Sequence, residues 1–248
     1  MINSNIEKIY LFLFSLIPIS VVMGSSVSLA NISFILIVFL IFTLKNIEKE
    51  IFNNSALIFL IFLYFYLIFN SFIAIDFEMS ASRNFGFIRF ILLFVVVNYF
   101  FNSSNKSNNI FVFWSLIVII VALDSFIEFS FGRNILGYGE KYGDRIVSFF
   151  KDEPVVGAYI NAFIFIIIGY FFDKFIEKDL KFKILLVLII FFLFSAVLIT
   201  GERSNGIKTL LGLILFFILN KKLNFNFKII TFLSVITIFS FVLINSSF

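Results

Sequence analysis

The stretch "ILLVLIIFFLFSAVLITGERSNGIKTLLGLILFFILN", Ile184–Asn220, sets the polar connection "GERSNG" between two long apolar runs. Each run approaches the roughly 20 residues that a helix needs to cross a bilayer. The connection is too short to leave a membrane surface, so the stretch predicts a helical hairpin whose tip lies at the lipid boundary. Apolar runs with short polar connections recur along the rest of the chain.

The composition of the 248-residue chain is that of a protein whose solvent is largely lipid. Hydrophobic residues make up 61% and charged residues 14%, and the mean hydropathy is +1.11. Soluble domains run near half apolar and a quarter charged. The absence of Cys and His removes thiolate chemistry, the commonest general base near neutral pH and the commonest transition-metal ligand. We therefore expect no metal, no cofactor and no nucleic-acid partner, and without a Gly-rich phosphate loop no use of ATP.

Apolar runs of near-spanning length predict an all-α, polytopic transmembrane helix bundle of about nine spans, forming a single domain over residues 1–248. The first run has a signal peptide as its alternative interpretation, but a second run follows at once. The longest connection, 124–154, is predicted to be a loop that folds against the membrane. The nine runs are Ile9–Met23, Leu29–Leu44, Ala56–Ile75, Phe87–Phe101, Ile110–Leu123, Val155–Phe172, Ile184–Thr200, Ile207–Leu219 and Ile229–Asn245.

Basic residues are partitioned by type between the two sides of the predicted bundle. Alternation of the spans places eleven Lys on one side, and three Lys with all five Arg on the other. The bias puts the N-terminus in the cytoplasm and the 124–154 loop on the outer face. Because guanidinium grips phosphate or carboxylate with two parallel hydrogen bonds, an outer anion site is one interpretation. Ion pairs with neighbouring acids, such as Arg203 with Glu202, are the other, and the sequence leaves both open.

The tip "GERSNG" has the features of an anion site at a helix start. Its two glycines permit a tight turn. Ser204 or Asn205 is expected to cap the following helix, whose free N–H groups favour an anion. The alternative is a plain polar hairpin tip with a Lys reaching to the membrane surface. The residues predicted to bind the anion are Arg203, Ser204 and Lys208, with Gly201 and Gly206 in the turn.

A second candidate site is "DRIVSFFKDEPVVGAYI", 144–160, where the long loop enters the sixth span. Pro154 is expected in the first helical turn. Gly157 permits close approach of another helix or a ligand, and Arg145 is within reach if the loop folds back. The alternative interpretation is a helix start and nothing more.

A third candidate site is "DFEMSASRNFGFIRF", 76–90, in which Arg83 and Arg89 bracket the start of the fourth span. Arg89 lies inside the apolar edge, where a charge is expensive and tends to face a cavity or a partner. Asp124 and Glu128, near the end of the fifth span, are candidate partners or a candidate base.

The motifs "RIVSFFKDEPVVGAYI", Arg145–Ile160, and "LITGERSNG", Leu198–Gly206, resemble in their order and spacing the O-antigen ligase and O-antigen polymerase family of bacterial inner-membrane proteins. The resemblance covers the second half of the chain by motif and the whole chain by its pattern of spans. Two positions depart from the family pattern, because Glu153 replaces an Asn and Glu202 stands where a small residue is common. Family members continue past the ninth span into a large outer loop that bears a His, which implies that this chain corresponds to the N-terminal portion of a longer architecture.

The resemblance implies a polyprenyl-diphosphate-linked glycan as donor and either the lipid A core or another lipid-linked glycan as acceptor, with no metal and no nucleotide sugar. It makes Arg145 and Arg203 the catalytic residues that hold the diphosphate, whereas Arg83 and Arg89 are inferred from charge alone. An acidic residue is expected to assist the acceptor hydroxyl, and the candidates are Glu128, Asp152 and Glu153. The alternative functions are a transporter or flippase for an anionic lipid or solute, and a membrane subunit with no chemistry.

Overall fold

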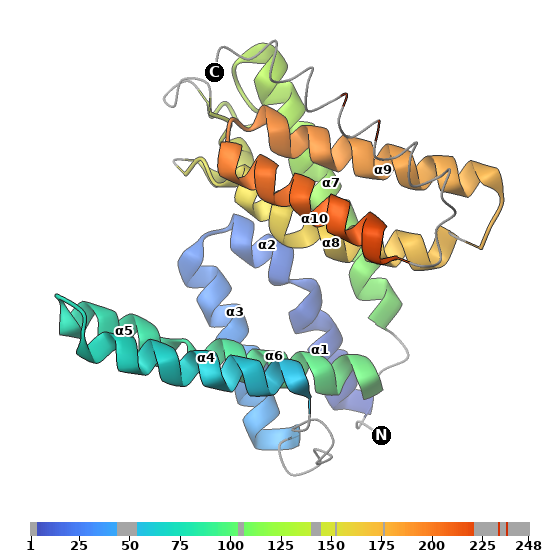
Figure 1. The fold of residues 1–248 in the computed structure, drawn as a ribbon. Coiled ribbons are helices and arrows are strands. Elements are labelled where there is room, and N and C mark those ends of the chain that lie inside the picture. Colours follow the sequence, from blue (N-terminus) through green and yellow to red (C-terminus); the bar gives the residue numbers. More distant parts are fainter. Residues whose placement is uncertain are drawn as a thin grey trace. The chain divides into compact units, whose positions relative to one another are not determined.

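A computed structural model describes residues 4–43, 54–103, 107–139, 145–151, 153–175 and 177–220, together with Leu233 and Thr237. These residues are helical throughout apart from their connections, and no strand occurs among them (Figure 1). The helices are α1 (Ser4–Ser15), α2 (Ile17–Val22), α3 (Ser25–Val38), η1 (Phe39–Thr43), α4 (Ser55–Phe72), α5 (Phe77–Gly86), α6 (Ile88–Ser103), α7 (Ser107–Phe131), η4 (Ser148–Phe150), α8 (Val156–Phe175), α9 (Leu180–Ile199) and α10 (Arg203–Leu219).

Seven segments are long and apolar enough to cross a membrane, as expected of a multi-pass membrane protein. Each of the first eight predicted spans overlaps a helix of the structure. The eighth lies in α10, a helix of 17 residues. At 1.5 Å per residue α10 is about 26 Å long, which falls short of the roughly 30 Å hydrocarbon core. The ninth predicted span, Ile229–Asn245, lies outside the described residues. Those residues hold seven candidate spans, and the total of nine stays a prediction.

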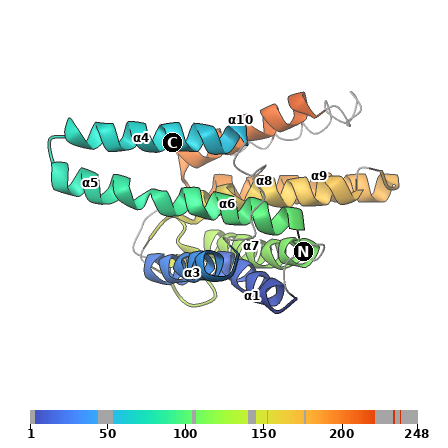
Figure 2. The same cartoon turned by 90° about the horizontal axis from the view of Figure 1, so that it is seen from below.

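The chain divides into two compact units, residues 1–110 and 111–248. The single transmembrane domain over residues 1–248 stays a prediction. In unit 1, α3 packs on α1, α2 and α6, and α4 runs beside α5 and α6 (Figure 2). Pro18 interrupts the first span, because its ring excludes a regular hydrogen bond, and α1 therefore ends at Ser15 before α2 begins. The core of unit 1 holds Tyr10, Phe14 and Phe100, whose ring centroids lie 5.0–6.0 Å apart.

Two side-chain amides hold the helices of unit 1 together where apolar packing alone does not fix their register. Asn31 Nδ2 on α3 donates to the carbonyl of Leu13 on α1 at 3.2 Å. Asn84 Nδ2 on α5 donates to the carbonyl of Leu67 and to Ser71 Oγ on α4, both at 2.8 Å. Buried amides in a lipid-facing bundle need such partners, because lipid offers no hydrogen bonds.

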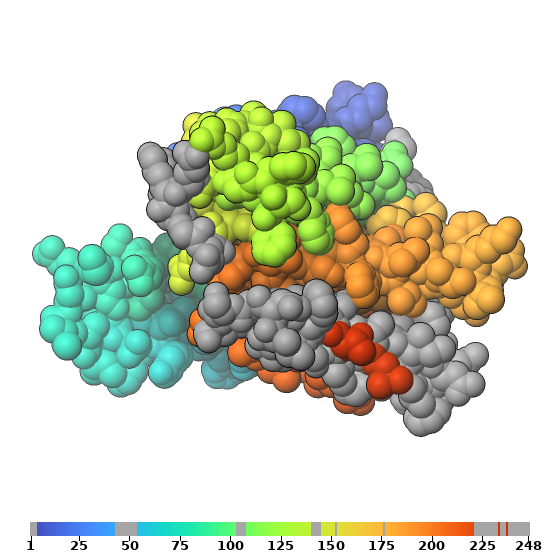
Figure 3. All heavy atoms as spheres, turned by 90° about the horizontal axis from the view of Figure 1, so that it is seen from above, coloured from blue at the N-terminus to red at the C-terminus, as the bar shows by residue number. Residues whose placement is uncertain are grey.

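Unit 2 is built on α8, which packs against both α9 and α10. The side chains between these helices are branched aliphatic and aromatic, and Ile160, Ile164, Phe194 and Leu213 are almost fully buried. The last turns of α7 and the segment that follows cover one face of the unit beside α9 (Figure 3), and Phe126 on α7 stacks on Phe192 at 5.3 Å. The helix α7 extends to Phe131, so the first eight residues of the predicted 124–154 loop are helical.

Candidate functional site

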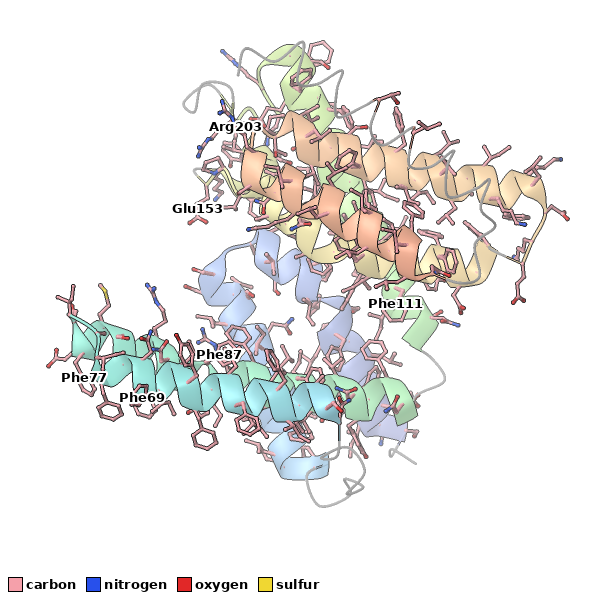
Figure 4. All side chains as sticks on the ribbon, in the orientation of Figure 1. Phe69, Phe77, Phe87, Phe111, Glu153 and Arg203 are labelled. Carbon is pink, nitrogen blue, oxygen red and sulfur yellow. The ribbon has the colours of Figure 1, made fainter. Side chains whose placement is uncertain are left out.

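Four separate segments of unit 2 meet at one end, which we call the arginine end: the last turns of α7 with residues 132–139 and 145–150, the start of α8, the end of α9 and the start of α10. The N–H of Ile146 donates to the carbonyl of Thr200 at 3.5 Å. The N–H of Gly157 donates to Glu202 Oε1 at 2.6 Å. Glu153 and Arg203 both lie at this end (Figure 4). The two sequence motifs, at 145–160 and 198–206, are therefore in contact.

Two carboxylates on successive turns of α7 anchor the segment that carries Arg145. Glu128 accepts from the N–H groups of Val147 at 3.0 Å and Ser148 at 2.6 Å. Asp124 accepts from the hydroxyl of Ser148 at 2.5 Å and from the N–H of Ile135 at 3.0 Å. Both carboxylates are buried. Since a carboxylate binds well to free N–H groups, this pair fixes the loop onto α7.

Glu128 is therefore an anchor, although the sequence made it a candidate base. Each of its two oxygens already accepts a hydrogen bond from a backbone amide, and the side chain is only 4% exposed. A base must reach the proton that it abstracts, whereas both oxygens of this buried carboxylate already accept from backbone amides. Of the other two candidates, Glu153 is exposed, and Asp152 lies outside the described residues.

Asn134 and Ser148 help to hold the arginine end together, and the sequence did not point to either residue. Asn134 Nδ2 donates to the carbonyl of Ser148 at 2.5 Å, and its Oδ1 accepts from the N–H groups of Leu136 at 3.0 Å and Tyr138 at 2.7 Å. Ser148 has a φ of 45°, which is unusual for a residue other than glycine. The contacts with Asn134, Asp124 and Glu128 hold it there. The sequence feature that could have predicted the role of Asn134 is its place in the glycine-rich "FGRNILGYG", because Asn side chains often hydrogen-bond to nearby backbone in turns.

The start of α8 differs in detail from the prediction. Pro154 precedes the first helical residue, Val156, by two positions and does not lie in the first turn. Gly157 is buried at the contact with the α9–α10 turn. A Cβ added there would lie 2.6 Å from Thr200 Oγ1 and 3.0 Å from Glu202 Oε1. The sequence predicted close approach of another helix or a ligand at Gly157, and the segment that approaches it is the turn between α9 and α10.

The turn between α9 and α10 is tight, and its helix start is capped differently from the prediction. Gly201 has a φ of 73°, which favours glycine. The helix α10 begins at Arg203, so Ser204 and Asn205 lie inside it and neither is its N-cap. Asn205 Nδ2 instead donates back to Glu202 Oε2 at 2.5 Å. Gly206 approaches α9 closely, because an added Cβ would lie 3.0 Å from Leu198 Cδ2.

The charged residues predicted to bind an anion in this part of the chain are exposed, namely Arg145, Arg203 and Lys208, and so is Ser204. Arg145 immediately precedes Ile146, whose N–H meets the carbonyl of Thr200. Arg203 follows Thr200 by three residues, a path of at most about 11 Å along the chain. The backbones that carry Arg145 and Arg203 therefore lie at the same end of unit 2.

The other two predicted arginines lie in unit 1. Arg83 is exposed in the last turn of α5. Arg89 is in the first turn of α6, where its guanidinium carbon lies 4.9 Å from the centroid of the Phe90 ring. In the part of the chain that the structure describes, the buried Nε of Arg89 has no hydrogen-bond partner. A joint site of these two arginines with Arg145 and Arg203 remains a prediction.

Metal-ligating side chains do not gather in the described ranges, where no group of three or more His, Cys, Asp or Glu is placed to hold an ion. Comparison with known proteins identifies no function for the chain. No family model, no curated protein sequence and no solved structure matches the chain. The resemblance to O-antigen ligases and polymerases therefore stays a prediction carried by the two motifs.

Proposed function

We propose that the chain takes part in the transfer of a polyprenyl-diphosphate-linked glycan at the outer face of the bacterial inner membrane, with its N-terminus in the cytoplasm. The observation that carries the proposal is the contact between the two arginine-bearing motifs, made by Ile146 with Thr200 and by Gly157 with Glu202. It brings the chain segments of Arg145 and Arg203 to the same end of unit 2, and both side chains are exposed there.

In the proposed reaction, the site stabilises the diphosphate as it leaves. An acceptor hydroxyl oxygen attacks the anomeric carbon of the donor sugar, and the bond from that carbon to the diphosphate oxygen breaks. The diphosphate leaves with the electron pair, and negative charge grows on it in the transition state. Arg145 and Arg203 are suited to that charge, because guanidinium donates hydrogen bonds to phosphate oxygens. The hydroxyl proton passes to a base, for which Glu153 is an exposed carboxylate among the described residues at this end.

The location of the charges favours an interfacial site over a transport route. Arg145, Arg203 and Ser204 lie at or beyond the ends of helices in unit 2, and Lys208 is six residues into α10. A transporter for an anionic lipid is expected to carry charges near the middle of its spans, at broken helices. An enzyme that uses a membrane-anchored donor needs its charges where the diphosphate lies, at the lipid boundary.

The test is complementation of cells that lack glycan polymerisation or ligation, scored by lipopolysaccharide banding. We expect Arg203→Ala to abolish the banding while membrane insertion stays normal, because exposed Arg203 contributes little to packing. Lys178→Ala, an exposed base at the opposite end of unit 2, is the matched control and should leave the banding unchanged. Normal banding with Arg203→Ala would overturn the proposal.

Purified protein in detergent separates transfer from transport. A mixture of lipid-linked glycan donor and acceptor in micelles has no two sides, so a flippase has nothing to do there. We expect glycan transfer in this mixture from the wild-type chain. Donor that is moved across liposomes but never transferred in micelles would favour the transport function instead.

A further inference from the structure

We propose that Glu202 is a positioning residue, whose carboxylate joins the start of α8 to the start of α10 and thereby fixes Arg203. The effect of Glu202 on catalysis rests on the proposed function, whereas its role in joining α8 to α10 does not. The carboxylate has one donor on each helix: the N–H of Gly157 on α8 at 2.6 Å, and Asn205 Nδ2 on α10 at 2.5 Å. Glu202 and Gly157 are 45 residues apart in the chain.

The surroundings of Glu202 are built for this contact. Gly157 has no Cβ, and an added one would meet Thr200 Oγ1 and the Glu202 carboxylate. Only glycine at this position therefore allows the α9–α10 turn to approach α8 this closely. The carbonyl of Glu202 also accepts from the N–H groups of Asn205 at 3.0 Å and Gly206 at 3.1 Å. A carboxylate beside the first turn of α8 is further stabilised by the positive end of that helix.

A second polar contact lies one turn deeper on the same pair of helices. Thr209 Oγ1 is 2.8 Å from Asn161 Oδ1 on α8 and 2.8 Å from the carbonyl of Asn205. Thr209 is fully buried, and Asn205 is 8% exposed. Two successive polar contacts on α8 and α10 resist sliding of one helix along the other, because each is lost if the register shifts.

The consequence for Arg203 follows from its place in the chain. Arg203 is the residue after Glu202 and the first residue of α10, so fixing the Glu202 carboxylate on α8 fixes the backbone from which the guanidinium extends. Since a shift of about 1 Å in a reacting group can cost about a hundredfold in rate, a residue that sets this backbone governs the reaction without touching the substrate.

An exchange of donor and acceptor tests the contact directly. Asn205→Asp sets two carboxylates against each other and should break the pair. Glu202→Gln in the same chain supplies an amide donor to the new carboxylate and keeps an oxygen for the N–H of Gly157. We expect Asn205→Asp to lower kcat for glycan transfer between about tenfold and a hundredfold with little change in KM. The double variant should recover most of the loss, and Glu202→Ala should resemble Asn205→Asp.

A structural readout keeps this inference separate from the proposed function. The chain has no Cys, so Ala158→Cys on α8 and Ser204→Cys on α10, both exposed, take spin labels at two defined positions only. We expect a narrow distance distribution between the labels in the wild-type background, a broad one with Asn205→Asp, and a narrow one again in the double variant.

The spin-label distances and the kcat values together distinguish three outcomes. A distance distribution that Asn205→Asp leaves unchanged would overturn the positioning role. A distribution that broadens while the kcat for transfer stays normal would overturn the catalytic half of it. If the distances behave as expected but the wild-type chain transfers no glycan, the joint between α8 and α10 is upheld and the proposed function fails.

Discussion

The two ends of unit 2 carry charge in different ways, although the same helices form both. At the arginine end, Glu128, Asp124 and Glu202 all accept hydrogen bonds from distant parts of the chain. At the opposite end, where α8 leads into α9, the bases are lysines on the surface. Lys178 Nζ lies 4.8 Å from the centroid of the Phe182 ring, and Lys174 Nζ is 3.1 Å from Tyr170 Oη.

The lysines at one end can serve to orient the protein in the membrane. The carboxylates at the arginine end hold segments of the chain in place. Lysines that rest on aromatic rings at a helix end need no defined geometry, and such contacts are typical of side chains that reach from an apolar surface to water. Buried carboxylates are costly unless every oxygen is satisfied. A chain keeps such groups where the positions of neighbouring residues matter, and here those neighbours are the segments that carry Arg145 and Arg203.

The largest expected effect is at Glu128. Glu128→Ala leaves the N–H groups of Val147 and Ser148 without their acceptor. Each unsatisfied buried group costs about 1–3 kcal/mol, so we expect a loss of about 3 kcal/mol in the free energy of unfolding. Unfolding in mixed detergent micelles measures it. The control is Glu177→Ala, an exposed acid at the lysine end, and equal losses in the two variants would erase the difference between the ends.

Gly157→Ala should be the next in size. The added methyl group would meet Thr200 Oγ1 and the Glu202 carboxylate, and overpacking of this kind costs about 1–3 kcal/mol. Gly169→Ala is a control on the same helix, because nothing lies within 4 Å of its added Cβ. There the better helix propensity of Ala should raise the free energy of unfolding by about 0.5–1 kcal/mol. Opposite signs for the two glycines in one unfolding assay are the expected outcome, and two losses of the same size would contradict it.

Thr209→Val should have a smaller effect. The substitution keeps the shape of the side chain and removes the hydroxyl that meets Asn161 and the carbonyl of Asn205. Hydrogen bonds between membrane helices contribute about 0.6 kcal/mol on average and rarely more than about 1.7. We expect a loss of about 1 kcal/mol, with a double-mutant cycle against Asn161→Ala showing that the two residues are coupled. Strictly additive losses would show that this contact does not hold α8 and α10 in register.

Lys178→Ala should have the smallest effect. Exposed bases contribute little to packing, so the free energy of unfolding should change by less than about 0.5 kcal/mol. Its loss should also leave glycan transfer unchanged, whereas Arg203→Ala is expected to abolish it. A drop in transfer with Lys178→Ala as deep as that with Arg203→Ala would mean that charge at either end serves the same purpose.

The helices were predictable from the sequence because lipid demands long apolar runs, and the first eight of the expected runs overlap helices. The resemblance implied that Arg145 and Arg203 hold one diphosphate, but the sequence did not predict the backbone contacts between the two motifs. The roles of Glu128 and Glu202 were not, because their partners lie 19 and 45 residues away for Val147 and Gly157, and no local pattern encodes that distance. Glu202, which stood out as a departure from the family pattern, is the residue that joins the two motifs.

Labelling at Ser204 tests the central claim most directly, since the chain has no Cys and Ser204→Cys places one thiol beside Arg203. We predict that a membrane-impermeant maleimide added outside the inner membrane modifies this thiol. We also predict that a polyprenyl diphosphate slows the modification more than the corresponding monophosphate does. Modification from the cytoplasmic side alone, or a rate that the diphosphate leaves unchanged, would contradict the account.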